Sequence, residues 1–350
     1  MIECRTLLME WYQANKRPLP WRESKNPYFI WLSEIILQQT RVEQGTPYFL
    51  RFKKHFPEIS VLAYAPEDEV LKLWQGLGYY SRARNLHYAA QQVMNEFGGK
   101  FPSNYQQIIK LKGVGPYTAA AISSIAFSEA KAAVDGNVTR VISRLFGIIE
   151  PVNTGSRPKE IQLLADELLD RNAPGDFNQA IMEFGAIQCT PKKPSCESCP
   201  ISSFCVAHKS GIVNNIPLKE KKIIRRSRFL HYLILSDGND VLIQQRTGKD
   251  IWQGLFEFPM IETDEDEELN LKQLDDFVKK DLIIEKINKE KKHILSHQDL
   301  WARFYHIKTE LKNLEIYQRV SIQELHTFAL PRLIDRYLEF NVLNDEKNEH

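Results

Sequence analysis

The chain has 350 residues, 43% hydrophobic and 11% aromatic, which is enough for two or three packed domains. No apolar run reaches the roughly 20 residues of a membrane-spanning helix, and the charged first 20 residues exclude a signal peptide, so we expect a cytoplasmic protein without membrane contact. The net charge of +1 hides an asymmetry, because residues 1–228 contain 30 Lys and Arg against 21 Asp and Glu, and residues 229–350 contain 16 against 24. A basic first part suits a polyanion such as nucleic acid, although solvated surface charge is the simpler alternative.

Helical periodicity dominates residues 1–205, where strand signals are scarce. Helix starts are indicated by Pro47, by Pro66 with its acidic first turn, by Ser103, and by Asp135 before Gly136 and Asn137. After an N-terminal helix, the predicted helices cover residues 28–38, 46–56, 67–75, 81–97, 104–111, 117–127, 137–148, 158–171 and 176–187.

A short segment between two predicted helices has the form of a helix-hairpin-helix turn. It reads Leu111-Lys112-Gly113-Val114-Gly115-Pro116-Tyr117-Thr118-Ala119. The two glycines permit a tight turn with positive φ, and Pro116 starts a helix whose free backbone N–H groups would hold a DNA phosphate. An ordinary helix–helix turn is the alternative, because an isolated G-x-G is a weak signal. On the first interpretation Gly113, Val114 and Gly115 contact the DNA backbone.

Four cysteines lie within 17 residues, in the pattern C-x6-C-x2-C-x5-C. They are Cys189, Cys196, Cys199 and Cys205, whereas Cys4 is isolated. Thiolates this dense hold a metal or an iron–sulfur cluster more often than they form disulfides in a chain of this length. Zinc and [4Fe–4S] both accept four cysteines, so the spacing leaves both open.

The periodicity ends after the cysteines. Residues 206–228, with a run of Lys and Arg, are predicted to be a linker. Beyond it the turn Ser236-Asp237-Gly238-Asn239 separates two strands, 229–235 and 240–245, as in a β-hairpin. An α+β domain is therefore expected. Its remaining predicted elements are a helix near 270–280, strands around 300–308 and 315–320, and a helix at 331–340.

Two acidic residues in different settings suggest acid catalysis. Glu34 lies among Trp31, Leu32, Ile35, Ile36 and Leu37, where burial would favour its protonated form. Asp135 precedes an expected helix, whose N-terminus would favour the anion. Opposite environments of this kind would separate a proton donor from a carboxylate that stabilises positive charge. The alternatives are an exposed or salt-bridged Glu34 and an Asp135 that only caps its helix.

The hairpin, the segment Val134-Asp135-Gly136-Asn137 and the cysteine loop together resemble the helix-hairpin-helix DNA glycosylases of the endonuclease III superfamily. Within it, Trp31–Thr40 and Gly76–Leu86 resemble the signatures of the MutY-type adenine DNA glycosylases. The resemblance spans nearly the whole chain and is most specific through about residue 205. In that superfamily this cysteine spacing binds [4Fe–4S], so the resemblance implies iron–sulfur rather than zinc.

The resemblance also implies a fold and a domain organisation. Residues 1–205 form a mainly α helix-hairpin-helix glycosylase domain with two lobes. The hairpin lobe covers about 28–133, and the cluster lobe combines the N-terminal helix with about 134–205. After the linker 206–228, residues 229–345 form an α+β Nudix-like 8-oxoguanine recognition domain, which Trp252-Gln253-Gly254-Leu255-Phe256-Glu257-Phe258-Pro259 matches.

The roles of individual residues follow from the same resemblance. Glu34 protonates adenine at N7, and Asp135 stabilises the oxocarbenium ion, with or without a covalent intermediate. Tyr117 stands where relatives with lyase activity carry the lysine that forms a Schiff base, so a monofunctional enzyme is implied. Arg140 and Arg144 lie near the cluster sulfurs.

The remaining implied residues contact the flipped adenine or the damaged guanine. Arg22 and Gln179 line the adenine pocket. Gln39, Thr40, Leu77 and Tyr79 surround the opposite guanine, with Gln39 and Tyr79 wedged into the base stack. Ser296 and His297 belong to the sequence His293-Ile294-Leu295-Ser296-His297, which matches H-x-F-S-H except that Leu295 replaces phenylalanine.

The function that these observations favour is a monofunctional adenine DNA glycosylase of base excision repair, acting on adenine opposite 8-oxoguanine or guanine in duplex DNA. We expect a monomer in the nucleoid of a bacterial-type cytoplasm. The alternatives are an endonuclease III-like glycosylase with AP lyase activity, a non-catalytic lesion binder, and a nucleotide pyrophosphatase. The last is disfavoured because the acidic segment Asp264–Glu268 lacks the arginine and spacing of a Nudix metal helix.

Overall fold

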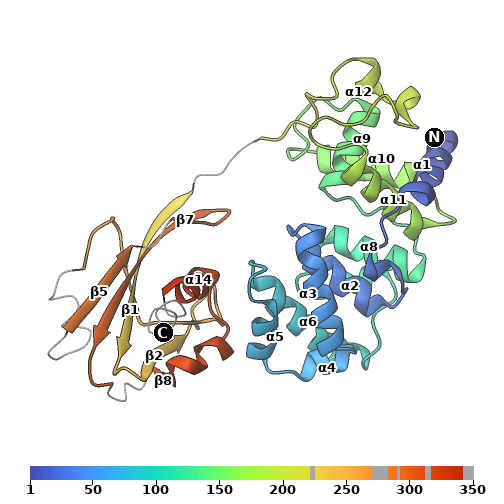
Figure 1. Cartoon of the computed structure of the whole chain (residues 1–350). Helices are drawn as coiled ribbons and strands as arrows, with labels where there is room; N and C mark the ends of the chain where they lie inside the picture. The colour runs from blue at the N-terminus through green and yellow to red at the C-terminus, as the bar shows by residue number, and fades with distance from the viewer. Residues whose placement is uncertain (221–224, 270–282, 290–291, 312–316, 342–350) are drawn as a thin grey trace. The chain divides into compact units, whose positions relative to one another are not determined.

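The computed structural model describes residues 1–220, 225–269, 283–289, 292–311 and 317–341. The chain divides into two compact units, both drawn in Figure 1. The first unit comprises Met1–Tyr64 and Asn85–Lys221, and the second comprises Ala65–Arg84 and Lys222–His350. Residues 65–84, which we assigned to the hairpin lobe, therefore pack with the C-terminal part of the chain.

The first unit is helical, and its described residues contain no strand. The α-helices are α1 (Ile2–Asn15), α2 (Pro27–Leu37), α3 (Val42–His55), α4 (Ile59–Tyr64), α6 (Ser81–Phe97), α7 (Tyr105–Ile108), α8 (Pro116–Phe127), α9 (Gly136–Phe146), α10 (Arg157–Leu168), α11 (Pro174–Ile187) and α12 (Val206–Lys209), with 3-10 turns η1 (Pro20–Arg22) and η2 (Ser202–Phe204). Helix α6 begins within the second unit.

Two groups of helices make up this first unit (Figure 1). Helices α2, α3, α7 and α8 pack together, and α1, α9, α10, α11 and α12 form the other group, with α8 packed on α11. The second group surrounds an apolar core that includes Leu8, Ile142, Phe177 and Phe184. Three of the cysteines, Cys189, Cys199 and Cys205, pack against the same core. Two expected lobes are therefore present, joined at α8 and α11.

Some helix boundaries differ from the sequence prediction. Helix α3 begins at Val42, so Pro47 lies inside it, in its second turn, and does not start it. Helix α7 begins after Asn104, whose side chain accepts a hydrogen bond from the Gln107 N–H. Pro66 does cap α5 (Glu67–Trp74), as its acidic first turn indicated.

The turn between α7 and α8 also differs in part from our expectation. Gly113 has the positive φ of 76° that a tight turn requires, and an added Cβ there would lie 2.7 Å from the Asn85 Cβ. Gly115 instead has an extended backbone and caps α8, with Pro116 in the first turn as predicted. Only one of the two glycines is therefore needed for its left-handed conformation.

The predicted linker 206–228 is too long at both ends, because a helix occupies its first residues and a strand begins at Arg226. Val206–Lys209 forms the short helix α12, which packs on α9. Ala207 is buried, and Val206 lies so close to Gly147 that an added Cβ would be 2.5 Å away. Ile216 is also buried, so the chain leaves the helical unit only after these residues.

The second unit combines α5 with a mixed sheet. The strands are β1 (Arg226–Ser236), β2 (Asp240–Gln245), β3 (Phe256–Glu257), β4 (Met260–Thr263), β5 (Ile283–Lys289), β6 (His293–Ile294), β7 (Gln298–Lys308) and β8 (Gln318–Ser321), followed by η3 (Ile322–Thr327) and α14 (Arg332–Asn341). The sheet order is β3-β2-β1-β7-β5, while β4 pairs with β1, β6 with β7 and β8 with β2. The predicted helix near 270–280 lies outside the described residues.

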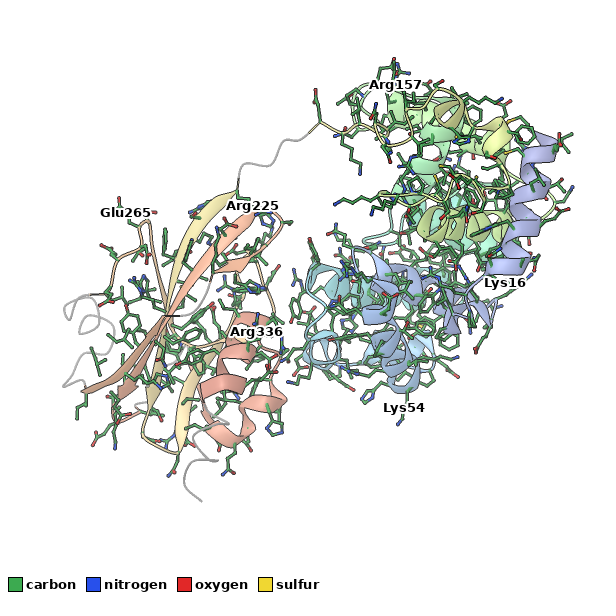
Figure 2. All side chains as sticks on the ribbon, turned by 45° about the horizontal axis from the view of Figure 1, so that its top comes forward. Lys16, Lys54, Arg157, Arg225, Glu265 and Arg336 are labelled. Atoms are coloured by element: carbon green, nitrogen blue, oxygen red, sulfur yellow. The ribbon has the colours of Figure 1, made fainter. Side chains whose placement is uncertain are left out.

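Strand pairing in this sheet confirms the predicted hairpin and places β1 beside β7. Strands β1 and β2 are antiparallel across the 236–239 turn, whereas β1 and β7 are parallel, with Arg226 opposite Gln298. Arg225, labelled in Figure 2, lies just before β1, and its guanidinium is 3.8 Å from the Asp299 carboxylate. Helix α14 covers the sheet through Tyr337, whose ring stacks on Phe304 at 3.7 Å. The predicted fold class, a helical domain followed by an α+β domain, is confirmed.

None of the helices within the described ranges has the length and apolar character needed to cross a membrane.

Candidate active site

Glu34 is placed by the apolar helix α2. The helix begins at Pro27, and its Asn26 cap accepts a hydrogen bond from the Tyr28 N–H at 2.9 Å. Trp31 and Ile35 are buried on this helix, whereas Glu34 keeps part of its side-chain surface accessible. The carboxyl is nevertheless crowded enough that burial raises its pKa from 4.5 to about 7.

The neighbours of Glu34 act on its pKa in both directions. Hydrogen bonding from the Tyr117 hydroxyl lowers it, the negative charge of Asp135 raises it, and the positive charge of Arg22 lowers it. All three were predicted from sequence to belong to one site. Their effects on Glu34 mean that the structure brings these side chains together.

Asp135 caps α9, as the sequence predicted. Its carboxylate accepts hydrogen bonds from the Val138 N–H at 2.7 Å and from the Asn137 side chain at 2.8 Å. These bonds favour the anion, but burial is the larger effect and raises the pKa of Asp135 above its usual value. We expected opposite environments for Glu34 and Asp135. Instead burial raises both pKa values, and the two carboxyls differ in the hydrogen bonds that Asp135 accepts.

Tyr117 lies in the first turn of α8, where both acids act on it. Burial raises its pKa well above the usual value, and the charges of Glu34 and Asp135 raise it further, so the phenol stays protonated. Its hydroxyl also lies 3.3 Å from the Met182 sulfur on α11. Tyr117 therefore connects the helices that carry the site.

Arg22 and Gln179, the residues predicted for an adenine pocket, line one cavity of about 180 Å³ together with Trp21. Arg22 is held by the buried Glu183, to which its guanidinium donates a hydrogen bond of 2.9 Å. Burial favours the neutral form of Glu183, but hydrogen bonds from Arg17 and Arg22 lower its pKa to about 2. The cavity thus contains a fixed cation, Arg22, whose positive charge also acts on Glu34, although Glu34 is not among the residues that line it.

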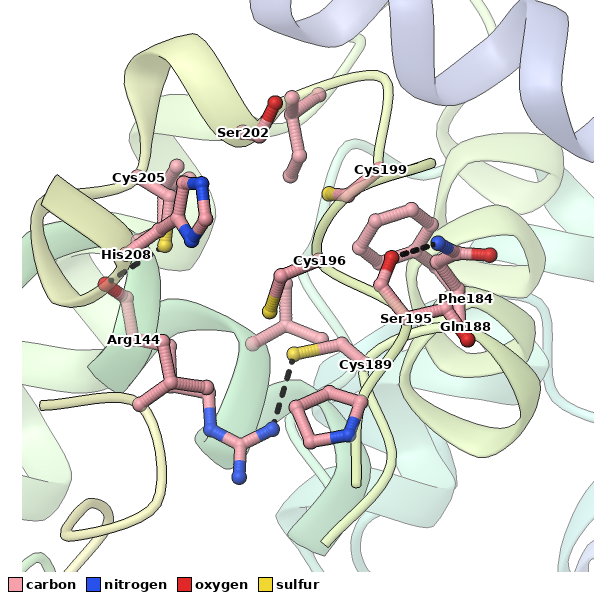
Figure 3. Close-up of a pocket in the computed structure, with 15 residues that line it drawn as sticks. Arg144, Phe184, Gln188, Cys189, Ser195, Cys196, Cys199, Ser202, Cys205 and His208 are labelled. Atoms are coloured by element: carbon pink, nitrogen blue, oxygen red, sulfur yellow. Dashed lines mark hydrogen bonds between the residues drawn. The ribbon is translucent and has the colours of Figure 1, made fainter. Parts of the chain in front are cut away.

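The four cysteines of the loop line a second cavity, shown in Figure 3. All four are free thiols. Arg144 lies beside them, with a guanidinium nitrogen 3.4 Å from the Cys189 sulfur. Arg140 donates to the Cys189 carbonyl at 2.8 Å and to the Asn137 side chain at 2.9 Å. Both arginines therefore contact the cysteine loop, as the resemblance implied, and Arg140 also reaches the hydrogen-bond network of Asp135.

The residues predicted to hold the DNA backbone are only partly accessible. Gly113 is exposed and Gly115 is half-exposed, but Val114 is buried and its N–H donates to the Leu111 carbonyl at 3.1 Å. Helix α8 has no side-chain cap, so backbone donors of its first turn remain available for an anion.

The two predicted wedge residues share an unusual backbone. Gln39 has φ of 55° and Tyr79 has φ of 49°, a left-handed conformation that is strained for residues other than glycine. Both side chains are exposed, with 46% of Tyr79 accessible. Of the neighbouring predicted contacts, Thr40 is half-buried and Leu77 is buried.

A cavity in the second unit, called the lesion-side cavity below, brings together Tyr79, Ser296 and His297 of the predicted contacts, whereas Gln39, Thr40 and Leu77 are not among its lining residues. It measures about 380 Å³ and is lined by Tyr79 from the segment before α6 and by Leu295, Ser296 and His297. Ser296 and His297 are exposed, and the Ser296 hydroxyl is 3.1 Å from His297 Nδ1. Its size is that of a small-ligand pocket.

Comparisons with known proteins agree with this geometry. The sequence profile of the HhH-GPD superfamily base excision DNA repair protein matches residues 32–171, and that of the NUDIX domain matches residues 231–340. An adenine DNA glycosylase of Buchnera aphidicola subsp. Schizaphis graminum is 35% identical over 347 residues, which are 95% of this chain and 97% of the relative. That of Buchnera aphidicola subsp. Baizongia pistaciae is 36% identical over 305 residues, 86% of this chain and 84% of the relative.

The chain belongs to the adenine DNA glycosylase family. As a member it is a DNA N-glycosylase of base excision repair that binds duplex DNA. The fold agrees with this membership, because the solved structure of a thermostable thymine-DNA glycosylase matches 59% of this chain and 95% of its own, with a TM-score of 0.55 and 33% identity.

An iron–sulfur cluster is the cofactor that the family and the cysteines indicate. The iron–sulfur binding domain of endonuclease III matches residues 189–205. Burial raises the pKa values of Cys196, Cys199 and Cys205, so their thiolates need a cation beside them. Four soft thiolate ligands that line one cavity fit an iron–sulfur cluster.

Several residues that the structure places at these sites were not identified from the sequence. Met182 and Glu183 contact Tyr117 and Arg22, but neither belongs to a pattern that marks chemistry. Asp250 and Arg84 line the lesion-side cavity. Each was detectable by its neighbours, because Asp250 precedes the Trp252–Pro259 segment and Arg84 lies within Gly76–Leu86.

Proposed function

We propose that this protein is a monofunctional adenine DNA glycosylase that removes adenine paired with 8-oxoguanine, or with guanine, from duplex DNA. The observation that carries the proposal is the mutual influence of Glu34, Tyr117 and Asp135 within one unit. The relatives named adenine DNA glycosylase support the choice of base.

The proposed first step is protonation of the base. The Glu34 carboxyl, half-protonated near pH 7, gives its proton to adenine N7. The C1′–N9 bond then breaks, and its electron pair leaves with the base. Arg22 and Gln179, which line one cavity, would hold the extruded adenine, and the charge of Arg22 also acts on Glu34.

The proposed second step stabilises the sugar. A cationic deoxyribose forms as the base departs, and the Asp135 carboxylate, oriented by Val138 and Asn137, faces its positive charge. Water then adds at C1′, and its proton passes to the Glu34 carboxylate. The proton that Glu34 gives to adenine is returned from water whether or not Asp135 bonds covalently to the sugar in between.

The absence of lyase chemistry is proposed from Tyr117. A phenol has no amine with which to form the Schiff base that an AP lyase needs. Its hydroxyl instead hydrogen-bonds to the acid that protonates the base.

Recognition of 8-oxoguanine is proposed for the lesion-side cavity. 8-Oxoguanine differs from guanine by an N7–H donor and an O8 acceptor, and a serine hydroxyl such as that of Ser296 both accepts and donates. Tyr79 and His297 line the same cavity. Gln39 and Tyr79 are proposed to fill the stack, with Thr40 and Leu77 beside the guanine.

The cofactor is proposed to be [4Fe–4S], held by the four cysteines. When bound, it would cross-link the loop, whose exposed Lys192 and Lys193 suit phosphate contact. We further propose a monomer that acts in the nucleoid of a bacterial-type cytoplasm, with a glycosylase domain followed by a Nudix-like recognition domain.

Single-turnover cleavage tests the proposal. Duplexes with adenine opposite 8-oxoguanine, guanine or thymine are compared, and the first is expected to react fastest. Glu34→Gln should abolish the reaction. Borohydride with abasic DNA should trap no protein–DNA adduct, because only an imine is captured. A trapped adduct would favour the endonuclease III-like alternative, and full activity of Glu34→Gln would contradict the proposed acid.

A further inference from the structure

Two segments of the C-terminal part line the lesion-side cavity. One is Asp250–Trp252 before β3, and the other is Ile294–His297, which runs from the end of β6 to the start of β7. They are separated by more than 40 residues in sequence, so their spacing depends on contacts that join them. A pocket that distinguishes two bases by one or two hydrogen bonds needs its walls held in place.

The buried guanidinium of Arg228 on β1 makes such contacts. Only 7% of this side chain is accessible. Its two terminal nitrogens donate to the two Asp250 carboxylate oxygens at 2.9 and 2.8 Å. One of them also lies 3.3 Å from the side-chain oxygen of Gln298, the residue that follows His297. Arg228 thus reaches the first loop directly and the second through its adjoining residue.

Glu262 on β4 fixes the guanidinium from a third side. Arg228 donates to its two carboxylate oxygens at 2.8 and 2.6 Å. The arginine is therefore held by two bidentate carboxylate pairs, a geometry that lysine cannot reproduce. Burying such a charge network contributes little net stability, so a role in positioning explains it better than a role in stability alone.

A second arginine completes the attachment of the first loop. Arg246 donates to the Asp250 carboxylate at 2.9 Å and to the Ile251 carbonyl at 3.0 Å, and it pairs with the buried Glu257 at 2.5 Å. Asp250 is thereby held between two arginines, and the wall that it forms is tied to β1 and β3.

In the second loop, backbone hydrogen bonds fix the residues on both sides of Ser296. The Leu295 N–H donates to the Gln298 carbonyl at 2.8 Å, and the Arg226 N–H donates to the His297 carbonyl at 3.3 Å. Ser296 lies between these two anchored residues. Its hydroxyl is therefore placed by the start of β1 and the start of β7.

We propose that Arg228 is a positioning residue for discrimination of 8-oxoguanine from guanine: it sets the distance between the Asp250–Trp252 and Ile294–His297 walls of the pocket. This inference rests on the proposed function of the cavity. Arg228 touches neither the base nor the catalytic acids, so its loss acts on the preference between lesion and guanine rather than on the chemical step.

The test is Arg228→Lys in the full-length protein loaded with its cluster. Binding is measured to duplexes that carry a non-cleavable adenine analogue opposite 8-oxoguanine or opposite guanine. We expect roughly tenfold weaker binding to the 8-oxoguanine duplex, the effect of one misplaced hydrogen bond, and unchanged binding to the guanine duplex. Asp250→Asn, which keeps the shape of the side chain, should reduce the same ratio and serves if Arg228→Lys does not fold.

Arg319→Lys is the matched control. Arg319 also pairs with two carboxylates of the same sheet, those of Asp237 and Asp240, but it lines no part of the cavity. It should leave the preference intact. Equal weakening on both duplexes, or an unchanged ratio in folded Arg228→Lys, would overturn the inference. A wild-type protein without any preference would instead overturn the proposed function, and this inference with it.

Discussion

Replacing Glu34 with glutamine is expected to stabilise the DNA-free protein at alkaline pH. Burial raises the pKa of Glu34 from 4.5 to about 7, so the folded protein holds this proton more tightly than the unfolded chain does. The resulting loss of stability is negligible below pH 4.5, grows as the pH rises towards 7, and is complete above 7. A difference of about 2.5 between the two pKa values corresponds to roughly 3 kcal/mol. Glutamine removes this loss.

The measurement is the free energy of unfolding of both proteins at pH 5 and pH 8, in the absence of DNA. The gain from Glu34→Gln should be about 1 kcal/mol at pH 5 and about 3 kcal/mol at pH 8, by the same linkage relation. Comparing each variant with wild type at one pH cancels the titration of all other groups.

Glu96→Gln provides the control, because Glu96 is an exposed acid on α6. Its stability difference from wild type should be the same at both pH values. If Glu34→Gln also shows no dependence on pH, or is less stable at pH 8 than at pH 5 relative to wild type, then burial does not hold the proton on Glu34. The proposed acid catalysis would lose its physical basis.

Three further predictions concern catalysis and DNA binding. The single-turnover rate of adenine release should fall about tenfold per pH unit above 7 as Glu34 loses its proton. Tyr117→Phe removes a hydrogen bond that lowers the pKa of Glu34, so this pKa should rise and the fall in rate should move to higher pH. A rate that rises with pH would contradict both expectations. Arg140→Leu removes the hydrogen bonds that join the cysteine loop to Asn137, the partner of Asp135. The single-turnover rate should therefore drop at least roughly tenfold, while the affinity for duplex DNA, measured by titration, is retained. Loss of affinity with an unchanged rate would argue against a link between the loop and Asp135. Gly113→Ala places a Cβ against a neighbouring side chain at positive φ, so the affinity for undamaged duplex, measured by titration, should fall. Unchanged affinity would argue against a DNA contact at this turn.

The sequence predicted most of what depends on local chemistry. Proline and acidic residues located the start of α5, and the Ser236–Asn239 turn located the β1–β2 hairpin. The prediction was wrong at Pro47, which lies in the second turn of α3 and not at its start. It was also wrong at Val206–Lys209, which is helical and packs on α9, a contact that the local sequence does not reveal.

The candidate site shows the same division. The four closely spaced cysteines line one cavity, and Asp135 caps α9, and each of these features depends on a short stretch of sequence. The net rise of the Asp135 pKa was not predictable from its cap, because it arises from burial by other helices. Glu183 and Arg228 were missed because each acts on a partner that is distant in sequence.

The left-handed backbones of Gln39 and Tyr79 have a consequence for how the enzyme scans DNA. Both conformations belong to the folded chain itself, so folding incurs their cost once for each molecule. In their proposed role as wedges, these residues would meet every base pair already in the required shape. Inspection of intact duplex would then lose no binding free energy to loop rearrangement, and the time spent on undamaged sequence would be short.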